Sequence, residues 1–201
     1  MTIVLVPLVL ATHNAHKVIE LRHILGAQLD GIDLMAYDGP EPVEDGTSFE
    51  ANALIKARAA SAHTGFAAIA DDSGIAVAAL GGAPGIHSAR YAGSRDDAEN
   101  LRLLLTNLQS ADDRSAEFLC AAALVLPDGR EFVELARWPG SVLPEAVGGG
   151  GFGYDPVFKP SGYSVSAAEL SPEEKNTISH RGQAFAALMP IVRPLLLGRH
   201  T

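Results

Sequence analysis

The sequence is poor in cysteine and in basic residues, and each scarcity excludes a class of protein. A single cysteine among 201 residues, Cys120, cannot form an intramolecular disulfide, which excludes a disulfide scaffold and fits a reducing cytosol. Cys120 stands in the apolar run FLCAAALVL, so we expect a buried side chain rather than a reactive thiol. Fifteen Lys and Arg against 24 Asp and Glu give a net charge of −9, which argues against binding to nucleic acid.

Long hydrophobic runs are also missing. The apolar stretch from Ile3 to Leu10 is too short for a membrane span, lacks a basic flank and leads into His13 and Asn14. We therefore interpret it as the first strand and expect a cytoplasmic protein with no membrane partner. Without internal repeats or a long Pro/Gly-rich linker, the sequence indicates a single domain over residues 1–201.

Strand-like and helix-like segments alternate along the chain. Strands are expected at residues 3–11, 32–36, 66–70, 118–126, 131–138 and 157–159. Helices are expected at residues 18–25, 48–63 and 96–108, with a capped helix start at 171–175 and a final helix after residues 179–182. Residues 139–153 are expected to form a loop, and the turn 127–129 joins two strands as a hairpin. The pattern predicts an α/β body with an antiparallel excursion.

Two adjacent carboxylates, Asp71 and Asp72, follow the apolar segment that begins at Phe66. An unpaired buried charge is costly, so we expect both carboxylates at an edge of the sheet, beside metal or solvent. The segment Asp71-Asp72-Ser73-Gly74 is also typical of a simple turn, because Asp and Ser bond their own backbone and Gly accepts a positive φ. The tetrapeptide alone does not decide between the two.

Thr12, Asn14 and Lys17 lie where the first strand is expected to meet the first helix. A helix N-terminus offers unpaired backbone N–H groups and the positive end of the helix dipole, which suits a phosphate. The alternative is that Thr12 or Asn14 caps the helix while Lys17 is solvated. The glycine-rich Walker loop is absent, so the site would be of another kind.

Lys56 and Phe152 each allow two interpretations. Lys56 shares one side of its helix with Asn52 and would face the phosphate site or be solvated, whereas Arg58 should point elsewhere. Phe152 follows the glycines 148–151, and it would stack on a flat ligand or pack into the core. His180 likewise is either a core histidine or part of a donor cluster.

Six motifs, taken in order, resemble the Ham1/RdgB-type inosine/xanthosine triphosphate pyrophosphatase family. They are Thr12-x-Asn14-x-x-Lys17, Phe49 to Lys56, Ala70 to Gly74, Gly81 to Tyr91, Phe152 to Pro156 and Ser179 to Gly182. The resemblance implies hydrolysis of ITP, dITP and XTP to the monophosphate and pyrophosphate with Mg²⁺, which keeps deaminated purines out of DNA and RNA. It also implies an α/β fold with an elongated central mixed β-sheet flanked by helices, two lobes around a substrate cleft, and a homodimer.

The resemblance also implies roles for individual residues. Asp72 would be the general base, and Asp72 and Glu44 would position Mg²⁺. The implied substrate-binding residues are Thr12, His13, Asn14, Ala15, His16, Lys17, Lys56, Ser73, Phe152, Gly153, Tyr154, Asp155, Lys175, His180 and Arg181. Phe152 would stack on the purine, and Arg181 or Lys175 would pair with its 6-oxygen, which adenine lacks.

Two other functions stay open on the sequence alone. One is a nucleotide sensor that binds through the same pocket without hydrolysis. The other is a pyrophosphatase that acts on modified pyrimidine triphosphates. The presence of both Asp72 and Lys17 favours an enzyme over a sensor.

Overall fold

The computed structural model describes residues 5–198, and within them six strands form one sheet in the order β2-β1-β3-β4-β5-β6. The strands are β1 (Val6–Leu10), β2 (Ile32–Ala36), β3 (Ala67–Val77), β4 (Ser115–Val125), β5 (Glu131–Val142) and β6 (Phe158–Pro160). The helices are α1 (Ala15–Leu25), α2 (Phe49–Thr64), α3 (Asp97–Asn107), α4 (Pro172–Ile178) and α5 (His180–Leu197). Because β1 pairs in parallel with β2 and β3 while β5 and β6 are antiparallel, the sheet is mixed, which confirms the expected α/β class.

The chain divides into two compact units. Unit 1 comprises the chain up to Asp72, the segment Ala121–Leu135 and the chain from Arg181 onward. Unit 2 comprises Ser73–Cys120 and Ala136–His180. Strands β3, β4 and β5 therefore each contribute residues to both units.

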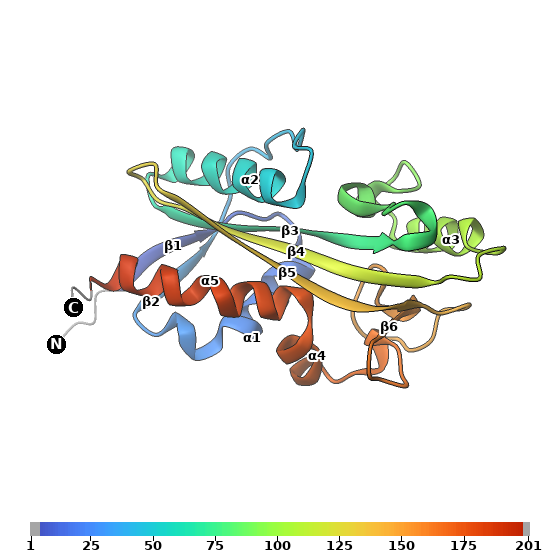
Figure 1. The fold of residues 1–201 in the computed structure, drawn as a ribbon. Helices are drawn as coiled ribbons and strands as arrows, with labels where there is room; N and C mark the ends of the chain where they lie inside the picture. Colours follow the sequence, from blue (N-terminus) through green and yellow to red (C-terminus); the bar gives the residue numbers. More distant parts are fainter. Residues whose placement is uncertain (1–4, 199–201) are drawn as a thin grey trace. The chain divides into compact units, whose positions relative to one another are not determined.

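Unit 1 is a layered α/β arrangement. Its parallel strands are covered by α2 on one face and by α1 and α5 on the other (Figure 1). With both faces covered, β1 consists of a continuous apolar run, as is typical of a buried parallel strand. Its core includes Leu8, Leu10, Leu21, Ile69 and Phe185, all fully buried.

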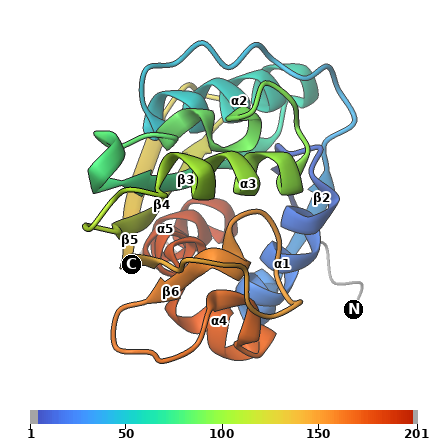
Figure 2. The same ribbon diagram turned by 90° about the vertical axis from the view of Figure 1, so that its right-hand side faces the viewer.

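Unit 2 has a core rich in aromatic side chains. The ring centroids of Phe118 and Phe158 are 4.6 Å apart, and those of Trp138 and Phe158 are 5.2 Å apart. Leu104 brings the apolar side of α3 to this cluster, and α3 lies over β3 and β4 in Figure 2. The antiparallel pairing of Val142 with Phe158 attaches the short strand β6 to the same core.

The strand expected at residues 66–70 continues to Val77 as β3, and this corrects the expected place of two acidic residues. Asp71 and Asp72 do not lie in a turn, since β3 continues beyond both residues. On one side of β3 they lie past the end of β1, whose pairing with β3 stops at Ile69. They are 1% and 8% exposed. Cationic side chains from other elements neutralise them, which overrides the local preference for a turn.

Other boundaries differ by a few residues. The strand expected at residues 3–11 is β1 over Val6–Leu10, and Ile3 lies outside the described residues. The loop expected from Pro139 begins later, because β5 continues to Val142 and pairs there with β6. The final helix begins at His180, so residues 180–182 form its first turn.

The single cysteine and the lack of long hydrophobic runs led to two expectations that can be compared with the structure. Cys120 is a fully buried thiol in β4, as its apolar surroundings predict. Within residues 5–198, no helix has both the length and the apolar character that crossing a membrane requires.

Candidate functional site

The loop between β1 and α1 is shaped by Asn14. Its Oδ1 accepts hydrogen bonds from the backbone N–H groups of His16, at 2.9 Å, and Lys17, at 3.2 Å, so Asn14 is the N-cap of α1. Thr12 Oγ1 in turn accepts the N–H of Asn14 at 3.2 Å. The Asn14 side chain therefore already accepts hydrogen bonds from two of the N–H groups in the first turn of α1 that could otherwise donate to a phosphate. Residues 13–16, which end the loop and begin α1, are exposed.

Asp71 is the most buried acid of unit 1, and two cations share one of its oxygens. Oδ2 accepts hydrogen bonds from Lys17 Nζ at 2.9 Å and from Arg181 Nε and Nη2 at 3.2 and 3.1 Å. Burial by itself would raise the pKa of Asp71. The charges of Lys17, Arg181 and Lys56 outweigh it and hold that pKa well below its usual range.

Arg181 also donates from Nη1 to the carboxylate of Glu20, which lies on α1 one turn after Lys17. Lys17, Asp71, Arg181 and Glu20 therefore form a row of alternating charges, which we call the charge chain. The guanidinium is 2% exposed, so its planar fork is fixed by two carboxylates in a site with little solvent. The structure thus places Arg181 in the carboxylate network of unit 1.

Asp72 points to α2 and to the loop before it. Its Oδ1 is 3.2 Å from Lys56 Nζ, and its Oδ2 accepts from Asn52 Nδ2 at 3.2 Å. Lys56 Nζ is also 3.4 Å from Glu44 Oε2, so one ammonium contacts both acids that were expected to position the metal. Burial lowers the pKa of Lys56, but Asp72, Asp71 and Glu44 outweigh that effect and raise the pKa above its ordinary value.

Asn52 holds the loop that carries Glu44. Its Oδ1 accepts the backbone N–H of Gly46 at 2.9 Å while its amide donates to Asp72, so one buried side chain ties this loop to β3. A Cβ at Gly46 would lie 2.5 Å from Asn52 Oδ1, which explains the glycine. Asn52 was not among the predicted site residues. Its position one turn before Lys56 was the available signal.

The donor set of unit 1 fits a magnesium ion only together with substrate oxygens. In the part of the chain that the structure covers, no three His, Cys, Asp or Glu side chains are grouped to hold a metal ion. Glu44 and Asp72 do share a cationic group, however, which shows that this position attracts positive charge. Mg²⁺ is commonly bound by one or two carboxylates, with phosphates and water completing its octahedron, and these two acids match that pattern.

A second group of predicted residues is assembled around Asp155 in unit 2. Its Oδ2 accepts the backbone N–H of Phe152 at 2.8 Å and Lys175 Nζ at 2.7 Å. The same ammonium lies 5.1 Å from the centre of the Phe152 ring, within the range of a cation–π contact. The Asp155 and Lys175 side chains are 4% and 8% exposed, whereas Phe152 is half-buried and does not belong to the core.

The glycine-rich segment before Phe152 follows a defined path. Gly150 N–H donates to the carbonyl of Ala168 at 3.0 Å, and Gly153 N–H donates to Asp97 Oδ2 at 2.9 Å. Gly151 has φ of +68°, and a Cβ there would collide with the carboxylate of Asp155. The glycines thus let the backbone wrap closely around Asp155 and present the ring of Phe152.

Tyr154 and His180 lie in the core of unit 2. The hydroxyl of Tyr154 donates to the carbonyl of Ser88 at 2.8 Å, and burial raises the pKa of Tyr154 well above its usual value. His180 stacks on Phe118 with ring centroids 4.6 Å apart and planes 6° apart. Ser73 is half-buried in β3, directly after Asp72.

The predicted residues therefore form two groups. Unit 1 contains Thr12, His13, Asn14, Ala15, His16, Lys17, Glu44, Lys56, Asp72 and Arg181, and unit 2 contains Ser73, Phe152, Gly153, Tyr154, Asp155, Lys175 and His180. Sequence reasoning did not assign Glu20, and it left Asp71 without a role. Arg181 is 110 positions from Asp71 and 161 positions from Glu20 in the sequence. Local sequence patterns cannot connect residues so far apart, and only the fold brings the two acids to Arg181.

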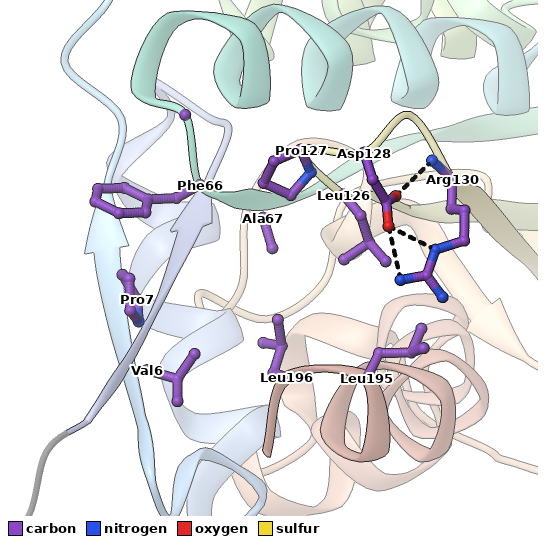
Figure 3. Close-up of a pocket in the computed structure, with 11 residues that line it drawn as sticks. Val6, Pro7, Phe66, Ala67, Leu126, Pro127, Asp128, Arg130, Leu195 and Leu196 are labelled. Carbon is purple, nitrogen blue, oxygen red and sulfur yellow. Dashed lines mark hydrogen bonds and ion pairs between the residues drawn. The ribbon is translucent and has the colours of Figure 1, made fainter. Parts of the chain in front are cut away.

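A pocket of about 260 Å³ in unit 1 lies apart from these residues (Figure 3). It is mostly apolar, with the ion pair of Asp128 and Arg130 on one side, and it lies where β1 and β3 begin. The predicted residues of unit 1 instead follow the carboxyl end of β1, lie inside β3, or belong to the loop before α2 (Glu44), to α2 (Lys56) and to α5 (Arg181). None of the predicted site residues lines the pocket.

Comparison with known proteins gives similar chains over nearly the full length. The profile of the Ham1 family matches residues 8–191. A relative from Leifsonia xyli subsp. xyli, named dITP/XTP pyrophosphatase, is 56% identical over 194 residues, covering 95% of this chain and 98% of the relative. Among solved structures, a HAM1 protein from Coxiella burnetii is 41% identical, with a TM-score of 0.85 over 94% of this chain and 98% of that chain. A nucleoside-triphosphatase / dITP/XTP pyrophosphatase from Mycobacterium abscessus is 47% identical, with a TM-score of 0.74 over 93% of this chain and 100% of that chain.

Proposed function

This chain belongs to the Ham1 family, and we propose that it hydrolyses the triphosphates of deaminated purines, dITP, ITP and XTP, to the nucleoside monophosphate and pyrophosphate. Relatives that carry the name dITP/XTP pyrophosphatase match almost the whole chain, which supports the reaction and the substrate class. The observation that carries the proposal is the environment of Asp72. Its carboxylate lies between Lys56 and Asn52 in the same unit as Lys17 and the N-terminus of α1.

The charges of this cluster support a divalent cation as cofactor. The cations are Lys17, Lys56 and Arg181, and the carboxylates are Glu20, Glu44, Asp71 and Asp72. Three positive charges against four negative charges leave a net charge of −1, so these side chains cannot neutralise a triphosphate. A metal ion that arrives with the nucleotide would supply the missing positive charge.

The proposed mechanism is attack of water on the α-phosphorus with pyrophosphate as the leaving group. Asp72 accepts the proton of the attacking water as general base. The ammonium groups of Lys17 and Lys56 bind phosphate oxygens and neutralise charge that develops on the leaving group. Mg²⁺ held by Glu44 and Asp72 would, when bound, lower the pKa of a coordinated water and screen the phosphates.

Unit 2 supplies the proposed recognition of the base. The half-buried ring of Phe152 offers a stacking surface, and a base stacked on an aromatic side chain gains about 1 to 3 kcal/mol. Lys175 beside this ring is a donor that pairs with the 6-oxygen of hypoxanthine or xanthine, whereas adenine presents an amino group there. A site built on such a hydrogen bond rejects the mismatched base strongly.

We test the proposal by measuring pyrophosphate and orthophosphate released from dITP, XTP, GTP and ATP, with Mg²⁺ and with EDTA. Metal-dependent pyrophosphate from dITP and XTP, with little from ATP or GTP, is the expected result. Asp72→Asn should abolish turnover while circular dichroism shows a folded protein, and Asp128→Asn, in the exposed hairpin turn, is the matched control.

Two results would support the alternatives instead. Turnover of dUTP or a methylated pyrimidine triphosphate in place of dITP would indicate a pyrimidine pyrophosphatase. Tight binding of dITP without any product would indicate a sensor.

The proposal extends to a cytosolic homodimer. The buried thiol of Cys120, the single cysteine of the sequence, fits a reducing compartment. Light scattering on the purified protein measures the assembly, and a monomeric mass would remove the dimer from the proposal.

A further inference from the structure

Lys56 contacts both carboxylates that would hold the metal. Its Nζ lies 3.2 Å from Asp72 Oδ1 and 3.4 Å from Glu44 Oε2. The side chains of Lys56 and Asp72 are 12% exposed and that of Glu44 is 20% exposed, so water screens the three charges only weakly. The other oxygen of Asp72 accepts from Asn52, so both oxygens already have a donor.

An ammonium and a metal ion compete for this position. Mg²⁺ binds oxygen at about 2.0 to 2.1 Å and requires a nearly regular octahedron. A metal bound to Asp72 Oδ1 and Glu44 would therefore lie within a few ångströms of Lys56 Nζ. Like charges so close in a half-buried site repel strongly, so the ammonium has to leave before the metal can bind.

A triphosphate offers the ammonium new anionic partners. The four-carbon stem of lysine is flexible, so Lys56 can exchange a carboxylate for a phosphate oxygen without movement of α2. That exchange frees Glu44 and Asp72 for the metal. Nucleotide binding then increases the affinity for metal, and by linkage metal binding increases the affinity for nucleotide by the same factor.

We infer that Lys56 is an internal counter-cation, which occupies the metal position in the nucleotide-free protein and makes metal binding depend on the triphosphate. This inference rests on the proposed function, because it takes Glu44 and Asp72 as the metal ligands. It gives Lys56 a second role besides phosphate binding. In that role Lys56 determines the order in which the two ligands are bound.

The test measures the affinity of the nucleotide-free protein for Mn²⁺, a paramagnetic substitute for Mg²⁺, by electron paramagnetic resonance. Lys56→Met keeps most of the stem and removes the charge, and we expect it to bind Mn²⁺ about tenfold or more tightly than wild type. Adding the α,β-imido analogue of dITP, which resists cleavage, should raise the Mn²⁺ affinity of wild type by about tenfold. The same addition should have a much smaller effect on the variant.

Two controls separate occupation of the site from a general change of charge. Lys17→Met removes the same charge from the same unit but leaves Lys56 between the two acids, so its Mn²⁺ affinity should change by less than about threefold. The double variant Glu44→Gln with Lys56→Met should lose the higher Mn²⁺ affinity that Lys56→Met alone gives. If Lys56→Met does not fold, Lys56→Gln serves instead, because its amide can still donate to one carboxylate.

A Lys56 variant that folds and binds Mn²⁺ no tighter than wild type would overturn the inference. Tight Mn²⁺ binding by nucleotide-free wild type would overturn it as well. Pyrophosphate release from dITP is measured on the same wild-type preparation. If wild type releases pyrophosphate but Lys56→Met binds Mn²⁺ no tighter than wild type, the inference fails and the proposed function stands. If wild type releases no pyrophosphate, the proposed function itself fails.

Discussion

Arg181 donates two hydrogen bonds to a single oxygen of Asp71, from Nε at 3.2 Å and from Nη2 at 3.1 Å. Lys17 donates to the same oxygen at 2.9 Å. A buried carboxylate shared by two cations is compatible with folding only because its charge is fully compensated. Asp71 therefore connects β3, α1 and α5, and this role differs from that of Asp72 beside it.

Asp71 makes the stability of the protein depend on acid pH. Its pKa is lower in the folded than in the unfolded state, so its charged form adds stability that is complete above the unfolded pKa of about 3.9. That stability is lost as the pH falls below this value toward the folded pKa. We expect Asp71→Asn to be less stable than wild type at neutral pH and to lose less stability between about pH 5 and about pH 3.

Urea unfolding over this pH range measures the effect. Asp112→Asn, at an exposed position, is the matched control and should follow wild type closely. Parallel curves for wild type and Asp71→Asn would contradict the lowered pKa.

Phe152→Ala should weaken binding of the uncleavable dITP analogue by about 1 to 3 kcal/mol, because the stacking surface is lost. Isothermal titration calorimetry gives the affinity, and thermal melting checks the fold. Phe66→Ala removes an exposed ring beside the apolar pocket of Figure 3, and should leave the affinity unchanged. An equal affinity for Phe152→Ala would exclude stacking.

Gly151→Ala should destabilise the protein by at least about 1 kcal/mol, since φ is +68° and the new Cβ would displace the Asp155 carboxylate. Because Asp155 fixes both Phe152 and Lys175, the KM for dITP should rise as well. Gly149→Ala is the control, because a Cβ there meets nothing within 4 Å. If the two variants have the same melting temperature and the same KM for dITP, the backbone around Asp155 is not as closely packed as described.

Tyr154→Phe should lower the free energy of unfolding by about 0.5 to 1.5 kcal/mol, because the hydrogen bond to Ser88 is lost. The KM for dITP should stay the same, since the hydroxyl is bound to the backbone in the core of unit 2. Denaturant unfolding and steady-state kinetics separate the two effects. A higher KM with unchanged stability would indicate that the Tyr154 hydroxyl contacts the substrate directly.

Local patterns predicted much of the fold and part of the site. The helical face that contains Asn52 and Lys56 was visible in the spacing, and both side chains do reach Asp72. Arg58 was expected to point elsewhere, and it pairs with Glu131 at 2.7 Å. Asn14 is the helix cap that its residue type suggests.

The errors arose where distant residues override local preference. Asp71-Asp72-Ser73-Gly74 favours a turn by composition, yet it continues β3 because Lys17, Lys56 and Arg181 compensate its charges. No spacing rule connects Asp71 with a residue 110 positions later. The partners of Arg181 therefore could not be predicted from a single sequence, and Glu20 was missed for the same reason.

The charge chain of Lys17, Asp71, Arg181 and Glu20 also limits how this sequence can evolve. Loss of Asp71 removes the carboxylate that Lys17 and the buried Arg181 share, and breaking such a buried pair costs about 3 to 5 kcal/mol, a large part of the stability of an ordinary domain. A lineage that replaces Asp71 must therefore replace Arg181 or Lys17 nearly simultaneously, or first acquire stabilising mutations elsewhere. The four positions should thus be inherited as a set, and a descendant that lacks one of them should carry a compensating change in another.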